Sequence, residues 1–173
     1  MLKAEPRVIR VDSIDNEFIE RIKEYGDPLA CFQCGTCLAS CPSGRRTAMN
    51  VRQLVRLAGM GMKEQVIHDE SLWACTTCYN CYERCPRNVK PVDVLIGIRN
   101  IAVESGFMLE GHVKTCKSLM KYGHAVSIDD KVIKMRESLG LSPVPPTIYA
   151  QAEQLEKVRD VLFSKFMPAE VKH

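Results

Sequence analysis

The chain has 173 residues, of which 46% are hydrophobic and 26% charged, as in ordinary globular proteins. Its formal net charge of +3 is small and its Lys and Arg residues are scattered, which argues against nucleic-acid binding. The apolar stretches are too short to cross a bilayer, and the charged first residues, MLKAEPRVIRVDS, do not resemble a secretory signal, so we expect a cytoplasmic protein.

The first predicted element is a helix that precedes every cysteine. Asp15 is suited to cap its N-terminus, and Gly26 is suited to end it. We therefore expect residues 1–28 to form an N-terminal segment that contains this helix. The apolar face of the helix consists of Phe18, Ile19, Ile22 and Tyr25.

The stretch CFQCGTCLASCP, residues 31–42, then places four cysteines within eleven positions, with a proline after the last. The same C-x2-C-x2-C-x3-C-P pattern returns 44 residues later, and eight of the nine cysteines belong to this internal repeat. The first group is Cys31, Cys34, Cys37 and Cys41, and the second is Cys75, Cys78, Cys81 and Cys85, followed by Pro42 and Pro86 respectively.

This spacing is typical of 4Fe-4S clusters. Three cysteines separated by two residues each can ligate three irons of one cubic cluster, and in two-cluster ferredoxins the fourth cysteine of each run ligates the other cluster. The sequence therefore predicts two 4Fe-4S clusters with eight cysteine ligands to iron. One cluster is assigned Cys31, Cys34, Cys37 and Cys85, and the other is assigned Cys75, Cys78, Cys81 and Cys41.

Two other uses of the cysteines fit the pattern less well. A zinc site would use two C-x2-C pairs separated by a longer gap, without a third cysteine close by. Disulfides are disfavoured in the cytoplasm. The basic residues just after the motifs either lie in solvated loops or offset the negative charge of the clusters and so raise their reduction potentials; they are Arg45, Arg46, Arg87 and Lys90.

The 33 residues between the two runs have a helical pattern. Asn50 and Gln53 are placed as a capping box and Gly59 as a stop. Small bacterial ferredoxins connect their cluster loops by short strands, whereas this spacer favours an all-α fold with an α-helical ferredoxin-type domain over residues 29–107. The apolar positions that share one face of the spacer helix are Val51, Leu54, Val55 and Ala58.

Three more helices are expected after the second run. A long one begins at Pro91 and ends before Gly106, another ends near Gly123, and a third runs from a cap at Ser127 to Gly140. The apolar faces are Val94, Leu95, Ile98, Ile101 and Ala102 in the long helix, Leu109, Val113, Cys116 and Met120 in the next, and Ile128, Val132, Met135 and Leu139 in the third.

Residues 108–173 are expected to form a C-terminal helical extension that docks a partner. Its proline-rich segment LSPVPPTIYA should be extended, either as a linker or as a strap across that partner. Cys116 is expected to lie in the core as a small hydrophobe. A last helix should place Ala152, Leu155, Val158 and Leu162 on one face, before a frayed tail.

The motifs of several catalytic classes are missing. The sequence has no G-x-G-x-x-G after a strand, no phosphate-binding G-x-x-x-x-G-K-[ST] and no plausible Cys, His and acid set for nucleophilic catalysis. We therefore expect no catalytic residues in this chain. Two clusters that each take one cysteine ligand from the other's run must lie close together. This proximity favours a relay for single electrons within an oxidoreductase complex.

Three segments, CFQCGTCLASCPSGR, WACTTCYNCYERCPR and LGLSPVPPT, together resemble the iron-sulfur C subunit of the soluble heterodisulfide reductases of methanogenic archaea. The resemblance implies a flavoprotein subunit that splits electron pairs by bifurcation and passes electrons through this chain. It also implies a catalytic subunit that reduces the mixed disulfide of coenzyme M and coenzyme B, and a hydrogenase or formate dehydrogenase that feeds the complex. The catalytic C-C-G-type motif of that family is missing here, which agrees with a relay.

Two other functions remain open. In the first, the chain is the iron-sulfur relay of another oxidoreductase, either a sulfur-metabolism complex or an anaerobic respiratory dehydrogenase. A relative of fumarate reductase would need a C-x4-C-x2-C run for a 2Fe-2S cluster, and none precedes Cys31. In the second, the chain is a zinc-binding interaction module without redox function, which metal analysis would distinguish.

Overall fold

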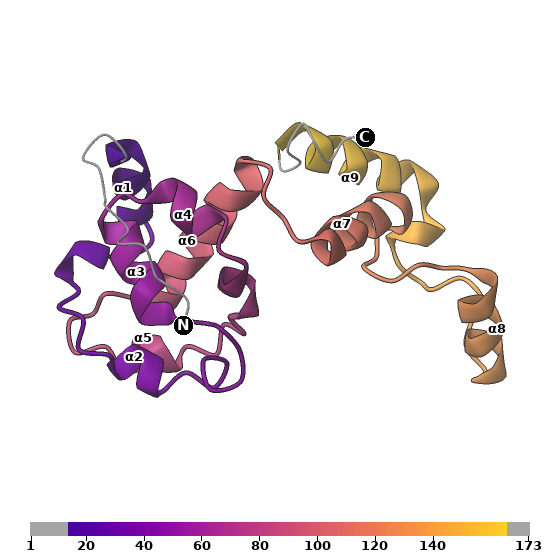
Figure 1. Ribbon diagram of the computed structural model, residues 1–173. Coiled ribbons are helices and arrows are strands. Elements are labelled where there is room, and N and C mark those ends of the chain that lie inside the picture. Colours follow the sequence, from indigo (N-terminus) through magenta and orange to yellow (C-terminus); the bar gives the residue numbers. More distant parts are fainter. Residues whose placement is uncertain (1–13, 166–173) are drawn as a thin grey trace, which may run out of the picture. The chain divides into compact units, whose positions relative to one another are not determined.

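The computed structural model describes residues 14–165, with side chains through residue 161. Every regular element in that part of the chain is a helix or a 3₁₀ turn and none is a strand, which confirms the expected all-α fold (Figure 1). No helix among these residues is long and apolar enough to span a membrane. The chain divides into two compact units, the first ending at Val103 and the second beginning at Glu104.

The first unit holds the cysteine repeat. The one-turn helices α2 and α5 pack against each other, and α3 contacts α1, α2, α4 and the 3₁₀ turn η2 (Figure 1). The elements in chain order are α1 (Asn16–Lys23), η2 (Pro28–Ala30), α2 (Thr36–Ala39), α3 (Val51–Gly59), α4 (Lys63–Ile67), η3 (Glu70–Ala74), α5 (Asn80–Glu83) and α6 (Pro91–Glu104).

The core of this unit is built from the apolar faces that the helical periodicity predicted. Burying one Leu or Ile side chain contributes about 1.5–3 kcal/mol, so this core provides a firm support for the cysteine loops. The predicted core residues of α3 and α6 are all at most 1% exposed: Val51, Leu54, Val55, Ala58, Val94, Leu95, Ile98, Ile101 and Ala102.

The predicted N-terminal caps of α1 and α3 are confirmed. The Asp15 carboxylate accepts a hydrogen bond from the Phe18 backbone N–H at 2.8 Å. The Asn50 side chain accepts from the Gln53 backbone N–H at 3.1 Å. The Gln53 side chain accepts from the Asn50 side-chain amide at 3.4 Å, instead of returning to its backbone as a full capping box requires.

The predicted end of α3 is confirmed, because Gly59 is its last residue. The predicted end of α1 is wrong by a few residues, since this helix ends at Lys23, before Gly26. The left-handed turn after α3 is made by Gly61, whose φ is +68°. Gly59 has a packing role, because a Cβ there would lie 3.2 Å from the Pro28 carbonyl oxygen of η2.

The second unit contains α7 (Glu110–Tyr122), α8 (Asp130–Ser138), η4 (Ile148–Ala150) and α9 (Ala152–Lys165). Helix α7 ends at Gly123 as predicted, with a φ of +70°. Helix α9 packs on α7, where Arg159 Nε donates to the Met120 carbonyl at 2.6 Å and Arg159 Nη2 to the Lys121 carbonyl at 2.8 Å. Leu155 of α9 is buried, and the side chain of Leu162, which was predicted on the same face, lies outside the described residues.

Several predictions for this unit are wrong. The carboxylate of Asp129 caps α8 by accepting from the Val132 N–H at 3.0 Å, so the cap is not Ser127 and the helix ends at Ser138. Met135 and Leu139 are 63% and 69% exposed. These two side chains therefore do not pack in a core among the described residues.

Two further expectations for the second unit need correction. Cys116 is only half-buried, and α7 has no buried residue, so Cys116 is not a core residue. The segment LSPVPPTIYA is irregular up to Thr147 and then forms η4, because its last proline is Pro146. The expected frayed tail lies outside the described residues.

Candidate iron-sulfur site

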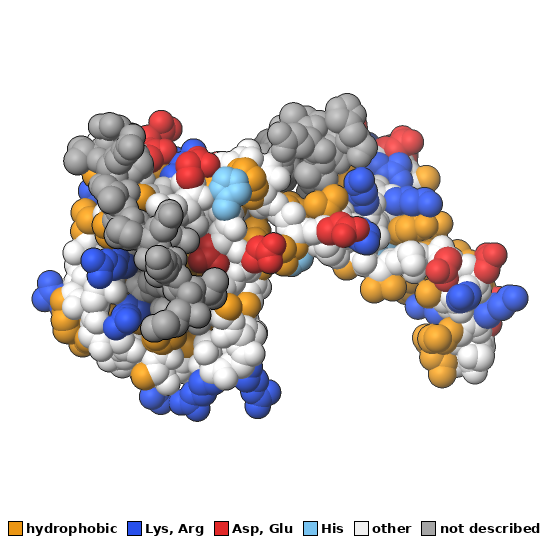
Figure 2. All heavy atoms as spheres, viewed as in Figure 1, with side chains coloured by type: hydrophobic (Ala, Val, Ile, Leu, Met, Phe, Trp, Pro, Cys, Tyr) orange, Lys and Arg blue, Asp and Glu red, His pale blue; other side chains and the backbone are white. Residues whose placement is uncertain are grey.

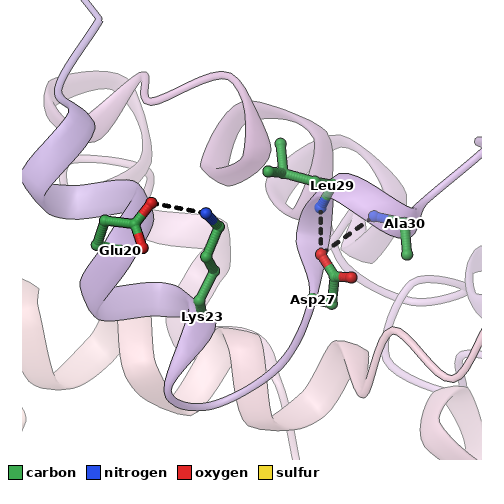
Figure 3. Close-up of polar contacts among 5 residues, drawn as sticks. All are labelled: Glu20, Lys23, Asp27, Leu29 and Ala30. Carbon is green, nitrogen blue, oxygen red and sulfur yellow. Dashed lines mark hydrogen bonds and ion pairs between the residues drawn. The ribbon is translucent and has the colours of Figure 1, made fainter.

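Each cysteine run starts directly after a capped 3₁₀ turn. One carboxylate oxygen of Asp27 accepts from the backbone N–H groups of Leu29 at 3.1 Å and Ala30 at 3.2 Å, next to the Glu20–Lys23 pair of α1 (Figure 3). Asp69 caps η3 in the same way, accepting from the Ser71 N–H at 2.9 Å. The caps fix the backbone from which the first cysteine of each run projects.

The two cysteine loops share the same unusual backbone. Gln33 and Gly35 have φ values of 63° and 86°, and their counterparts 44 residues later, Thr77 and Tyr79, have 50° and 62°. Left-handed residues between right-handed ones turn successive N–H groups to one side, which makes a concave site for an anion. Each non-glycine residue with a left-handed backbone conformation costs about 1–3 kcal/mol, and such strain is typical of functional sites.

The third cysteine of each run lies within a short helix, Cys37 in α2 and Cys81 in α5. Burial, followed by repulsion from Cys31, raises the pKa of Cys37 to about 11. Burial, followed by repulsion from Cys75, raises the pKa of Cys81 to about 12. Crowded thiols of this kind suit iron, because the metal takes the place of the proton and neutralises the thiolate charge.

The fourth cysteines lie with the opposite runs. The Cys85 thiolate is among the charges that raise the pKa of Cys37, and the Cys41 thiolate is among those that raise the pKa of Cys81. One cavity is lined by Cys41 together with the first three cysteines of the second run and by apolar residues of α3 and α6. Its lining includes Cys41, Cys75, Cys78, Cys81, Val51 and Val92.

Two long-range hydrogen bonds connect the segments around the two runs. The buried Ser43 hydroxyl, two residues after Cys41, donates to the Ala74 carbonyl at 2.6 Å, directly before the second run. The Asp27 N–H, before the first run, donates to the Val89 carbonyl at 3.2 Å, after the second run. The chain that leaves each fourth cysteine is therefore tied to the chain that approaches the opposite run.

The sulfur of each fourth cysteine accepts a backbone hydrogen bond. The Gly44 N–H lies 3.2 Å from Cys41 Sγ, and the Val89 N–H lies 3.3 Å from Cys85 Sγ. Hydrogen bonds to the ligand sulfurs are among the influences on the reduction potential of an iron-sulfur cluster.

Arg99 supports the second run and was missed by the sequence analysis. Its Nη2 donates to the Cys75 carbonyl at 2.7 Å and to the Leu72 carbonyl at 2.8 Å, and its Nε donates to the same Leu72 carbonyl at 3.1 Å. The guanidinium also lies over the Trp73 ring, 5.7 Å from its centroid. A single cation inside the apolar sequence VLIGIRNIAV was the signal that could have found it.

The basic residues after the motifs are mostly exposed, in agreement with solvated loops. Arg45, Arg46 and Arg87 are exposed and Lys90 is half-buried. Arg45 Nη2 donates to the Ala39 carbonyl at 3.1 Å. Figure 2 shows Lys and Arg side chains gathered along the lower edge of the first unit.

The cysteines are not arranged around a single ion. Among residues 14–165, no three His, Cys, Asp or Glu side chains form a site for one metal ion. In a 4Fe-4S cluster each thiolate binds a different iron, so the four sulfurs need not converge on one point.

Comparisons with known proteins identify the family. A family model described as a 4Fe-4S dicluster domain matches residues 28–89, which include both cysteine runs. The chain is 48% identical to the C subunit of the H(2):CoB-CoM heterodisulfide,ferredoxin reductase of Methanothermobacter marburgensis, over 94% of this chain and 89% of the relative. It is 42% identical to the iron-sulfur C subunit of the CoB--CoM heterodisulfide reductase of Methanopyrus kandleri, over 91% and 88% of the two chains.

A third relative is the C2 subunit of the H(2)/formate:CoB-CoM heterodisulfide,ferredoxin reductase of Methanococcus maripaludis, with 38% identity over 88% of each chain. Identity at this level over most of both chains shows that they belong to one family. The matched region includes the C-terminal unit as well as the cysteine domain. The chain therefore belongs to the family of C-type iron-sulfur subunits of heterodisulfide reductases, and its dicluster domain binds two 4Fe-4S clusters.

Proposed function

We propose that this chain relays single electrons through its two clusters, from a flavin-containing subunit to a catalytic subunit that reduces the heterodisulfide of coenzyme M and coenzyme B. The observation that carries the proposal is the packing of α2 on α5, because it brings the two cysteine runs together within one small unit. Two redox centres so close to each other suit electron exchange.

We propose crossed ligand sets for the clusters. The shared cavity, the repulsion between Cys41 and Cys81, and the hydrogen bond from Ser43 to Ala74 support a place for Cys41 in the second set. The repulsion between Cys85 and Cys37 supports a place for Cys85 in the first. The first set is Cys31, Cys34, Cys37 and Cys85, and the second is Cys75, Cys78, Cys81 and Cys41.

The clusters, when bound, supply the one-electron chemistry, and the residues of this chain hold and shield them. The left-handed loops turn backbone N–H groups toward the anionic site. Val51 and Val92 form apolar walls beside the cysteines of the second set and are at most 1% exposed. Such walls limit the access of water, which lowers the local dielectric and influences the reduction potential.

The proposed partners extend to an electron donor. The name of the relative from Methanothermobacter marburgensis includes H(2), and that of the relative from Methanococcus maripaludis includes H(2)/formate. We propose that a hydrogenase or formate dehydrogenase supplies electrons to the complex that contains this chain. A cytoplasmic location agrees with nine cysteines that form no disulfide among the described residues.

The activity of the native complex tests this function. We expect an anaerobically isolated complex that contains this chain to oxidise reduced viologen dye when the coenzyme M–coenzyme B heterodisulfide is added. The same complex without heterodisulfide is the control and should leave the dye reduced. A complex that keeps its cluster spectra but does not respond to the heterodisulfide would assign the relay to another oxidoreductase, such as one of sulfur metabolism.

We also propose that residues 108–173 dock another component of the complex. Apolar side chains around α8 are strongly exposed, and covering each of them contributes about 1.5–3 kcal/mol. The exposed residues are Val126, Met135, Leu139 and Leu141.

Ending the chain before Leu141 should weaken assembly by tenfold or more while both clusters remain, as size-exclusion chromatography and iron analysis would show. Because this cut also removes α9 from α7, the double substitution Met135→Ser with Leu139→Ser provides a second test. Both side chains are exposed, so it should weaken assembly without unfolding the unit. Unchanged assembly of both variants would refute docking by this extension.

A further inference from the structure

The two halves of the repeat differ in the hydrogen bonds that side chains make to the cluster ligands. In the first run, Gln33 Nε2 lies 3.2 Å from Cys31 Sγ, and Thr36 Oγ1 lies 3.4 Å from Cys34 Sγ. A thiolate bound to iron carries no proton, so the amide and the hydroxyl must be the donors. The first run thus has two side-chain donors on its sulfurs.

The corresponding positions of the second run provide no such donors. Position 33 corresponds to Thr77, whose hydroxyl donates to the Thr76 carbonyl at 2.8 Å. Position 36 corresponds to Asn80. Among the described residues, no side chain donates a hydrogen bond to the sulfur of Cys75, Cys78 or Cys81. The two runs repeat their cysteines and proline but differ at every residue between them, including the two positions that hold the donors of the first run.

The other polar influences are more evenly matched. Each fourth cysteine accepts one backbone N–H, from Gly44 in one half and Val89 in the other. Each half also has two arginines at its loop, Arg45 and Arg52 in the first and Arg84 and Arg99 in the second. The side-chain bonds to sulfur distinguish the first half from the second.

The geometry holds both donors in place. Gln33 Nε2 also lies 3.5 Å from the Arg52 carbonyl of α3, so the side chain is tied between the helix and the sulfur. Thr36 begins α2, which fixes its hydroxyl beside the Cys34 sulfur.

We infer that Gln33 and Thr36 raise the reduction potential of the first-run cluster above that of its neighbour, so that a single electron on this chain resides on the first-run cluster. Hydrogen bonds to the sulfurs withdraw negative charge from a cluster and stabilise its reduced form. This inference rests on the ligand sets proposed above. Both residues are positioning residues for the relay, because they act on the cluster through its cysteine ligands.

A redox titration of the full chain with both clusters bound, followed by electron paramagnetic resonance, tests the inference. The variant Gln33→Met with Thr36→Val removes both donors and nearly keeps the side-chain volumes. Of the two midpoint potentials, the higher one should fall by about 59 mV, which is a tenfold change for one electron, and the lower one should not move. The control Thr115→Val removes a hydroxyl on α7 that bonds the Gly111 carbonyl, outside the cysteine loops, and it should shift neither potential.

The possible results distinguish a failure of this inference from a failure of the proposed ligand sets. A fall in the lower potential, or no shift while both signals remain, would overturn the inference and leave the ligand sets intact. A wild-type chain without two 4Fe-4S signals would overturn the ligand sets and the inference together.

Discussion

Replacing Cys41 with alanine is expected to remove the cluster of the second run and to leave the cluster of the first run intact. Cys41 lies in one cavity with the first three cysteines of the second run. Its loop is also fixed there by the hydrogen bond from Ser43 to Ala74. Iron content should fall from about eight atoms per chain to about four, because each cubic cluster has four irons.

Double variants identify which cluster is lost. In the Cys41→Ala chain, a further Cys75→Ala change should remove no more iron, whereas a further Cys31→Ala change should remove the remaining four atoms. The opposite pattern would show that Cys41 ligates the cluster of its own run. Cys85→Ala is the matched variant and should give the mirror-image result, and Cys116→Ala should keep both clusters.

The fold of the first unit could be predicted because its helices are amphipathic and packed within the chain itself. Leu54 and Ile98 lie at the positions that periodicity places in a core, and both are fully buried. The second unit shows the limit of this reasoning. The pattern that places Met135 and Leu139 on one apolar face does not show what covers that face. Helix α8 ends before Leu139, and both side chains are exposed.

The site could be predicted as far as its ligands follow a spacing rule. The eight cysteines are marked by the repeat, and the crossed sets follow from ferredoxin precedent and stay a prediction until the double variants are made. The supporting contacts could not be foreseen, because they join residues far apart in sequence. Ser43 and Ala74 are 31 positions apart, and Arg99 and Leu72 are 27 apart. No local pattern specifies which carbonyl a side chain will reach.

Arg99→Leu is expected to destabilise the second cluster selectively and to lower the free energy of unfolding of the domain by about 3 kcal/mol. The change removes the three hydrogen bonds that Arg99 donates to the Leu72 and Cys75 carbonyls. An unsatisfied buried acceptor costs about 1–3 kcal/mol. Since Cys75 is the first ligand of its run, loss of these bonds frees the backbone on which that ligand depends.

Loss of iron to a chelator, followed over time in the folded chain, would measure the selectivity. Half of the iron should leave faster from Arg99→Leu than from the wild-type chain, and the other half should leave at the wild-type rate. Asn100→Ala, an exposed neighbour on α6 that bonds the Tyr25 hydroxyl, is the control and should change stability by no more than about 0.5 kcal/mol. Equal rates of iron loss from these two variants would contradict a supporting role for Arg99.

Arg99→Lys separates the charge of Arg99 from its shape. A lysine keeps one positive charge near the second cluster, but its ammonium lacks the planar fork that bonds two carbonyls at once. If charge alone mattered, Arg99→Lys would retain iron as the wild type does. We expect only partial recovery, because the three bonds to Leu72 and Cys75 require two different nitrogens of one guanidinium. The second cluster would then depend on Arg99 mainly for the position of its first ligand, whereas the first cluster depends on Gln33 and Thr36 for hydrogen bonds to its sulfurs.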